Sequence, residues 1–273
     1  MEQLSLCQRW KGGREYYRTG RETIRVREYG IDIVSDRRAR HFIAEHHYAP
    51  NSPPQILSVG LFRKVGVTES QLVGIARFSV PMNQHAVPRH TGQEPGHGCE
   101  LGRLVLMDEV PGNGESYFLA RAMRVLRQER PNIRAVVSYC DPVARYRQDG
   151  TLFKRGHIGI CYQALNARHV GRAKPRTLLM TRSGHVLSER SLSKFKHRER
   201  GEAYAYRQLL KAGCPERKLG EDREVYLERA LQEGGVVRQR HPGNLVYCWA
   251  VGSARDRKVA WSRMPPAQIY PKA

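Results

Sequence analysis

Short apolar runs bounded by turn residues alternate along this chain with stretches whose apolar residues recur at helical spacing. The runs at 56–62 and 72–80, joined by a polar turn, predict an antiparallel hairpin. Between residues 115 and 130, apolar side chains recur every three or four positions, which predicts an amphipathic helix that Pro131 ends. A shorter helix is predicted to begin at Asp36, which can cap it, and to end near residue 45. Together these elements predict an α/β protein.

A second set of elements follows in the order strand, turn, helix, strand, helix. The strand-like run at 101–106 leads into a Pro/Gly/Asn turn and then into the helix at 115–130. A buried-looking run at 135–138 and a helix-compatible segment at 156–168 come next. This order resembles the N-acetyltransferase superfamily, in which the pyrophosphate of acyl-CoA sits on the turn. The resemblance implies a mixed central sheet flanked by helices.

The rest of the chain predicts smaller elements and a division into segments. We expect an edge strand at 23–27, a long surface loop at 81–98, a hairpin at 177–181 and 186–187, and helices between about 190 and 233. Residues 235–249 predict a strand, a Pro-Gly-Asn turn and a second strand. The expected segments are a basic N-terminal part (1–35), the catalytic core (36–195), a basic helical and β-hairpin extension packed on the core (196–252), and a flexible tail (253–273).

The charge of the chain points to a polyanionic partner. Lys and Arg total 47 against 26 Asp and Glu, so the net charge is +21, and the excess is spread along the chain. Such a field attracts nucleic acid above all. No basic amphipathic helix, no run of about 18 apolar residues and no secretory signal is recognised, so a membrane role is disfavoured. The six scattered cysteines lack zinc or redox spacing, which favours a cytoplasmic protein with reduced thiols.

The turn before the helix at 115–130 is the candidate cofactor site. Glycines there let the backbone approach a ligand closely, and the free amides of the following helix start favour phosphate oxygens. The alternative is that the turn is only a tight connection, because it is neither a Walker sequence nor a dinucleotide fingerprint. The residues concerned are Pro111, Gly112, Asn113, Gly114, Glu115 and Ser116.

Polar residues around the run at 135–138 are the candidate catalytic groups. Ser138 and Asp141 follow an apolar strand and are expected at the edge where α/β sheets bind ligands, although each could instead satisfy a backbone group. Tyr162 is placed to act as a general acid or, equally, to be a core residue. His47 and Tyr48, at the end of the first helix, could carry protons or simply be structural. A zinc site formed by the three histidines of 81–98 is disfavoured by their wide spacing.

Taken together, these segments resemble the Mom family of bacteriophage DNA-modification proteins over about residues 36–195. The resemblance implies an N-acetyltransferase-like fold and conversion of adenine N6 in duplex DNA to a methylcarbamoyl adduct, which protects phage DNA from host restriction in the host cytoplasm. It makes His47, Tyr48, Ser138, Asp141 and Tyr162 the active-site candidates. The matching pieces are His47-Tyr48, 101–106, Pro111-Gly-Asn113, Glu115-Ser116, Val137-Ser138, Asp141-Pro142, 156–159, 162–166 and Gly171-Arg172.

The resemblance also bears on cofactors. It implies acetyl-CoA or a related acyl-CoA as the donor, and iron has been linked to the family, although the sequence offers no evident ligand set for iron. Cys140, between Ser138 and Asp141, departs from the small or hydroxyl residue expected there. Asp141 is the expected base, Ser138 positions the substrates and Tyr162 donates a proton.

Basic residues outside this cluster are the expected DNA contacts. They are Lys194, Lys196, Arg198 and Arg200 in the densest basic stretch, and Arg168 and Arg172 near the core. Two alternatives remain open: an N-acetyltransferase that acts on a tRNA base or a protein amine, and a non-catalytic DNA-binding protein with the same fold. A DNA clamp alone needs neither the cofactor turn nor the cluster of Ser138, Asp141 and Tyr162.

Overall fold

The computed structural model describes residues 4–11, 14–19, 23–47, 49 and 51–272, of which 4–19 only as backbone. The chain forms two compact units, both discontinuous in sequence. Unit 1 comprises Met1–Pro142, His157–Ala173 and Asn244–Ala273, and unit 2 comprises Val143–Gly156 and Lys174–Gly243. The expected boundary near residue 195 therefore falls inside a helix of unit 2, and the chain returns to unit 1 after residue 243.

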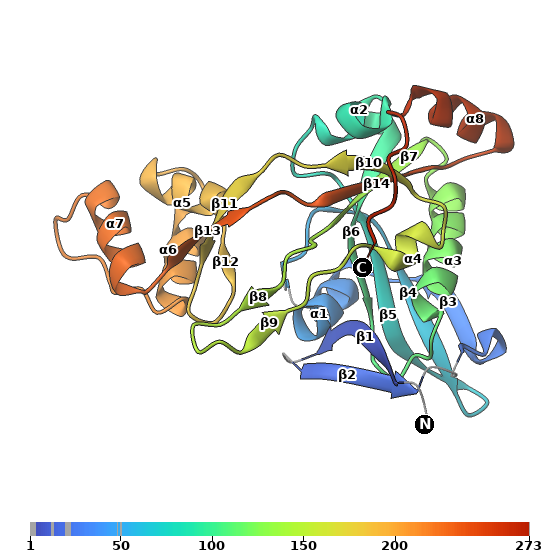
Figure 1. The fold of residues 1–273 in the computed structure, drawn as a ribbon, viewed down its shortest axis with the longest axis horizontal. Coiled ribbons are helices and arrows are strands. Elements are labelled where there is room, and N and C mark those ends of the chain that lie inside the picture. The colour runs from blue at the N-terminus through green and yellow to red at the C-terminus, as the bar shows by residue number, and fades with distance from the viewer. Residues whose placement is uncertain (1–3, 12–13, 20–22, 48, 50, 273) are drawn as a thin grey trace. The chain divides into compact units, whose positions relative to one another are not determined.

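Unit 1 is built on a seven-stranded mixed sheet of order β10-β14-β7-β6-β5-β4-β3 (Figure 1). All neighbouring strands are antiparallel except β6 and β7, which are parallel. The strands are β3 (Tyr29–Ile33), β4 (Gln55–Val65), β5 (Glu69–Ser79), β6 (Gly98–Leu106), β7 (Ala135–Cys140), β10 (Arg168–Arg172) and β14 (Leu245–Ala250). A separate antiparallel pair is formed by β1 (Leu4–Lys11) and β2 (Arg14–Thr19).

Helices cover both faces of this sheet. On β14, alternate residues enter two different clusters: Tyr247 and Trp249 pack with α3 and α4, whereas Val246 and Cys248 pack with α8. Helix α1 lies against the face of β5 and β6 that carries Ile75 and Val105. The helices are α1 (Asp36–His46), α2 (Ala86–Thr91), α3 (Gly114–Glu129), α4 (Ile160–Gln163) and α8 (Ala254–Arg263), with 3-10 turns at Val26–Glu28 and Pro95–His97.

Unit 2 has its own hydrophobic core and its own sheet. Strands β11 (Arg176–Met180), β12 (Val186–Leu187) and β13 (Val237–His241) form a sheet of order β12-β11-β13, and β8 (Arg145–Tyr146) pairs with β9 (Leu152–Lys154). Helices α5 (Glu189–Lys196), α6 (Glu202–Lys211) and α7 (Arg223–Glu233) bury Phe195, Leu209 and Tyr226 against Leu179 and Leu187.

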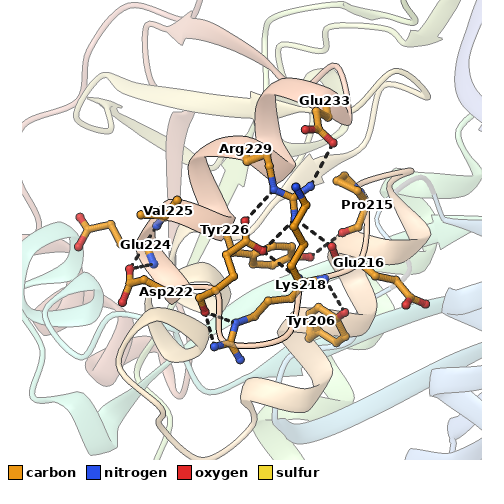
Figure 2. A network of polar contacts seen from close by, with 12 residues as sticks. Tyr206, Pro215, Glu216, Lys218, Asp222, Glu224, Val225, Tyr226, Arg229 and Glu233 are labelled. Carbon is orange, nitrogen blue, oxygen red and sulfur yellow. Dashed lines mark hydrogen bonds and ion pairs between the residues drawn. The ribbon is translucent and has the colours of Figure 1, made fainter.

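A polar network fixes the connection between α6 and α7 in unit 2 (Figure 2). Nε of Arg229 donates to the Glu221 carboxylate at 2.7 Å, and this hydrogen bond lowers the pKa of Glu221 to about 2. Arg229 also binds the Glu216 carbonyl at 3.0 Å, while the Tyr226 hydroxyl donates to the Pro215 carbonyl at 2.9 Å. The 213–222 segment is therefore held against α7 although it has no regular secondary structure.

Several sequence expectations are confirmed. The hairpin at 56–62 and 72–80 is β4 and β5, the helices expected from Asp36 and at 115–130 are α1 and α3, and the hairpin at 177–187 is β11 and β12. The expected mixed central sheet flanked by helices is present. Among the described residues, no helix is long and apolar enough to cross a membrane.

Other expectations are wrong in detail. The strand pair at 235–249 is not a hairpin, because β13 pairs with β11 whereas β14 inserts between β7 and β10. Residues 253–273, expected to be a tail, contain α8, and the 81–98 loop contains α2 and a 3-10 turn. The edge strand is β3 instead of 23–27, and the helix expected at 156–168 shortens to α4. For β13 and β14, partners distant in sequence decide the structure, whereas α8 begins at a local capping box formed by Ser253 and Asp256.

A buried arginine ties α1 to the sheet. Arg77 of β5 is 0% exposed, and its Nη2 donates to the Asp36 carboxylate at 2.6 Å. Its Nε donates to the Pro53 carbonyl at 3.0 Å, and its Nη1 lies 2.9 Å from Gln55 Oε1 and 3.4 Å from Ser58 Oγ. The hydrogen bond with Arg77 is the largest cause of the lowered pKa of Asp36, and it outweighs desolvation, which acts to raise that pKa.

We expect Arg77→Met to lower the free energy of unfolding by roughly 3 kcal/mol or more at neutral pH, because its four partners, among them the buried Ser58, lose a fully buried donor. The pKa of Asp36 is lowered in the folded state, so its ionised carboxylate stabilises the fold at pH values above its ordinary pKa of 3.8. This stabilisation is lost as the pH falls through the lowered pKa. The difference between variant and wild type should therefore shrink in urea titrations at pH 3.

Arg40→Met is the matched control, since Arg40 binds the same carboxylate at 2.6 Å but its side chain is 55% exposed. Its effect should stay within about 1 kcal/mol. Equal effects of the two substitutions would contradict the role given to Arg77.

Candidate active site

The site forms where the parallel strands β6 and β7 separate. The two strands pair at Gly98↔Ala135, Cys99↔Val136 and Glu100↔Val137, and the last of these pairs is where they separate. At the next position the Ser138 hydroxyl donates to the Leu101 carbonyl at 3.0 Å. A side chain thus takes the place of a backbone donor at the point of separation. Ser138 is only 1% exposed, so this hydrogen bond lies in the core.

Tyr162 lies next to Ser138. Its hydroxyl is 3.3 Å from the Ser138 hydroxyl oxygen. In this contact the Ser138 hydroxyl is the donor and the Tyr162 hydroxyl accepts, so Ser138 points toward both the Leu101 carbonyl and Tyr162. Tyr162 belongs to α4, whose N-cap is Gly159 with a left-handed φ of 75°. A Cβ at Gly159 would lie 2.7 Å from Cys140 Sγ and 3.1 Å from the Tyr162 ring, so only glycine allows this approach.

Two residues of β14 that were not candidates in the sequence hold the Tyr162 ring. Tyr247 and Trp249 make edge contacts with Tyr162, at centroid distances of 5.7 and 5.2 Å. The Tyr247 hydroxyl donates to the Ile158 carbonyl at 2.6 Å and accepts from Gln163 at 3.0 Å. Burial raises the pKa of Tyr247 to about 12, so its hydroxyl stays protonated. Tyr247 and Trp249 therefore fix the position of Tyr162.

Asp141 follows the last residue of β7 and is 5% exposed. Its carbonyl accepts a hydrogen bond from the His157 amide at 2.9 Å. This bond joins the point where the chain leaves unit 1, after Pro142, to the point where it returns, at His157. Cys140, the departure noted in the sequence, is fully buried beneath Gly159. Cys140 is thus a packing residue of the core, and Asp141 stands three residues beyond Ser138.

The segment after α1 is fastened to β6 by Arg103. His47 is the C-cap residue of α1, and its Nδ1 lies 2.9 Å from the Ala49 amide. Nε of Arg103 donates to the Ala49 carbonyl at 3.3 Å, and its Nη2 donates to the Asn51 carbonyl at 2.5 Å. Arg103 stands two residues after Leu101, so the segment is attached near the point where β6 leaves β7. Tyr48 lies outside the described residues.

The candidate cofactor turn joins β6 to the N-terminus of α3. Asn113 adopts a left-handed conformation with φ 63° and makes no side-chain cap. The first amides of a helix have no partner within the helix, so this helix start can take phosphate oxygens. The Gly112 carbonyl accepts from the Ile24 amide at 2.9 Å, which fixes the turn from the other side. Glu115 in the first turn opposes an anion at this position.

The expected DNA contacts fall on different units. In unit 2, Arg198 and Arg200 are exposed, whereas Lys196 pairs with Glu224 at 2.5 Å and Lys194 is half-buried. In unit 1, Arg172 is exposed at the end of β10. Arg168 binds the Trp261 carbonyl at 2.9 Å and stacks on the Trp261 ring at 4.6 Å, so the structure gives it a role in holding the end of α8.

A metal site has no ligand set in the part of the chain that the structure describes, where no group of three or more His, Cys, Asp or Glu is gathered. His90 instead makes an edge contact with Tyr139 at 6.0 Å, and burial lowers its pKa. We therefore assign no step to iron.

Comparison with known proteins adds a family match. The model of the Mom protein family matches residues 28–229, which extends beyond the part recognised in the sequence and into α7. A curated relative, methylcarbamoylase mom of Escherichia phage Mu, is 26% identical over 147 residues. These cover 53% of this chain and 54% of the relative, so the chain spans about half the length of the relative it matches.

Among solved structures, a tandem GNAT protein from the clavulanic acid biosynthesis pathway, without AcCoA, resembles the chain with a TM-score of 0.36 and 9% identity. The likeness covers 83% of this chain and 75% of that chain. Values this low add nothing to the topology described above.

Proposed function

Because this chain belongs to the Mom protein family, we propose that it is an enzyme that converts adenine N6 in duplex DNA to a methylcarbamoyl-type adduct. Its similarity to methylcarbamoylase mom of Escherichia phage Mu supports this proposal. The observation that carries it is the buried contact between Ser138 and Tyr162 at the separation of β6 and β7, with Asp141 at the end of β7.

In this proposal the side chains divide the proton transfers. The amine of adenine is a poor nucleophile, because its lone pair is delocalised into the ring. Asp141 accepts the N6 proton as the new bond forms, which is general-base catalysis. Tyr162, whose hydroxyl accepts a hydrogen bond from Ser138, donates its proton to the leaving atom. Ser138 holds Tyr162 and the edge of β6 in place, and His47 lies on the segment that Arg103 fastens to the same strand.

We propose acetyl-CoA or a related acyl-CoA as donor. When bound, it would supply the activated acyl carbons of the adduct and release the CoA thiol, whereas the nitrogen of the methylcarbamoyl group, which an acetyl group lacks, has to come from a second, nitrogen-containing co-substrate. Its phosphates would lie at the turn of Pro111, Gly112, Asn113, Gly114, Glu115 and Ser116, where the uncapped start of α3 suits them. The N-acetyltransferase-like order of β6, turn, α3 and β7, with β6 and β7 parallel, supports this assignment.

The proposed partner is double-stranded DNA, and the net charge of +21 supports it. An adenine must leave the base stack to enter a pocket, at a cost of roughly a few kcal/mol, and contacts with phosphates can offset this cost. The adduct would protect phage DNA from host restriction in the host cytoplasm.

Nucleoside mass spectrometry of plasmid DNA from cells that express the protein tests the proposal. We expect a mass-shifted deoxyadenosine that is absent from cells with the empty vector. Unmodified DNA together with modified tRNA or protein would replace this function by the alternative acyltransferase. Unmodified DNA, tRNA and protein, with salt-dependent DNA binding retained, would leave only a binding protein.

A further inference from the structure

The β8–β9 hairpin is an excursion of the chain from the candidate active site into unit 2. The chain leaves unit 1 after Pro142, immediately beyond Asp141, and returns at His157, whose amide binds the Asp141 carbonyl. Between these points lie only 14 residues, Val143–Gly156. Both ends of the hairpin are therefore anchored beside Asp141.

The tip of the hairpin is held rigid by local hydrogen bonds. The Asp149 carboxylate accepts from the Thr151 amide at 2.8 Å and from the Thr151 hydroxyl at 2.6 Å, which is a turn that aspartate favours. Across the hairpin, the Arg147 amide donates to the Thr151 carbonyl at 2.8 Å. The one acidic side chain of the hairpin is thus used within its turn.

The hairpin is also fixed to the turn between β11 and β12. The Gln148 amide donates to the Arg182 carbonyl at 3.0 Å, and the Phe153 ring makes an edge contact with His185 at 4.7 Å. Gly184 has a φ of 85°, and a Cβ there would lie 2.6 Å from Phe153. Arg147 covers the Phe153 ring at 5.4 Å. Both turns therefore form one preorganised surface within unit 2.

This surface exposes an aromatic ring whose neighbours in the chain are arginines. Tyr146 is 55% exposed, and Arg145 precedes it and Arg147 follows it. Arg145 and Arg147 also act on His185, whose pKa is lowered first by burial and then by these two charges. The Arg182 side chain, also exposed, lies instead against Gly235 and donates to the Glu233 carbonyl at 3.4 Å. An exposed aromatic ring flanked by arginines suits a stack of bases and its phosphates.

We propose that the β8–β9 hairpin is a duplex-DNA contact in which Tyr146 stacks on the bases beside the target adenine while Arg145 and Arg147 bind the phosphates. This inference rests on the proposed function. In any arrangement of the two units, five residues of chain keep the Cα of Tyr146 within about 18 Å of that of Asp141, which is less than the width of a duplex. An aromatic ring at this distance can fill the stack that the extruded base leaves.

The experiment compares Tyr146→Ala and Tyr146→Phe with wild type, and uses Tyr204→Ala as the control. Tyr204 is a second exposed tyrosine of unit 2, on α6, with an exposure of 47%. We expect Tyr146→Ala to weaken binding to a mixed-sequence duplex by about tenfold at fixed salt, as loss of a stacked aromatic does. Tyr146→Phe should bind like wild type, because the ring is kept, and so should Tyr204→Ala.

A second measurement detects stacking without any chemistry. Duplex DNA should quench the emission of Tyr146→Trp more than that of wild type or Tyr204→Trp. Wild-type affinity in Tyr146→Ala together with no added quenching would overturn the inference, as would stronger quenching by single strands than by duplex. If the inference holds but plasmid DNA carries no modified deoxyadenosine, only the proposed function fails.

Discussion

Asp141→Asn is expected to lower the yield of modified deoxyadenosine by about 100-fold or more. The substitution keeps the size of the side chain and its accepting oxygen, but it removes the group that takes the N6 proton, and general-base catalysis is worth roughly 10²–10⁴-fold. Binding to duplex DNA should change little, since Asp141 is buried and carries no phosphate contact. Quantitative mass spectrometry of nucleosides, beside a duplex-binding titration, measures both.

Asp32→Asn is the matched control, because Asp32 loses the same charge at an exposed position of β3. It should modify DNA like wild type. Full activity of Asp141→Asn would remove Asp141 from catalysis. Loss of folding, seen as an altered circular dichroism spectrum, would instead show a structural role for the buried carboxylate.

Replacing Lys194, Lys196, Arg198 and Arg200 together by Gln is expected to weaken duplex binding by about tenfold or more. Each phosphate contact releases counterions, so the slope of log affinity against log salt should become shallower by up to about 3.6. Unit 2 is suited to such contacts, since its Lys and Arg outnumber its Asp and Glu by twenty to ten. The measurement is a binding titration at several salt concentrations.

The control removes four other exposed cations of unit 2, Lys174, Arg207, Lys211 and Lys218. It lowers the net charge equally, so any general field effect appears in both variants. Only the loss of local contacts should separate them. Equal slopes for the two variants would exclude Lys194 to Arg200 from the interface.

The sequence predicts those parts of the fold that depend on neighbours along the chain. The stripe of α3, the cap of α1 and the polar turn between β4 and β5 are local signals, and all three elements are present. The family was also predicted correctly from short motifs, although its match reaches residue 229 and not 195. Ser138 and Tyr162 were chosen separately, and the structure brings their hydroxyl groups to 3.3 Å.

The remainder depends on contacts between distant segments. Nothing near Tyr247 or Trp249 indicates that β14 belongs beside β7, since an equally good hairpin with β13 can be drawn from the Pro-Gly-Asn turn. Arg103 gives no signal that it binds two carbonyls about 50 residues earlier. The roles of Asp141, His47 and the cofactor turn stay predictions, since they concern molecules that bind to the chain.

The place of β14 in the sheet has a consequence for how the protein is made. Its partner β7 precedes it by about 110 residues, and all of α5, α6 and α7 is synthesised between them. While a ribosome adds those residues, β7 has one edge without its neighbour, and Tyr162 lacks the two rings that hold it. Unit 2 has a core of its own and can fold in this interval. The candidate active site can therefore be completed only after unit 2 has been synthesised.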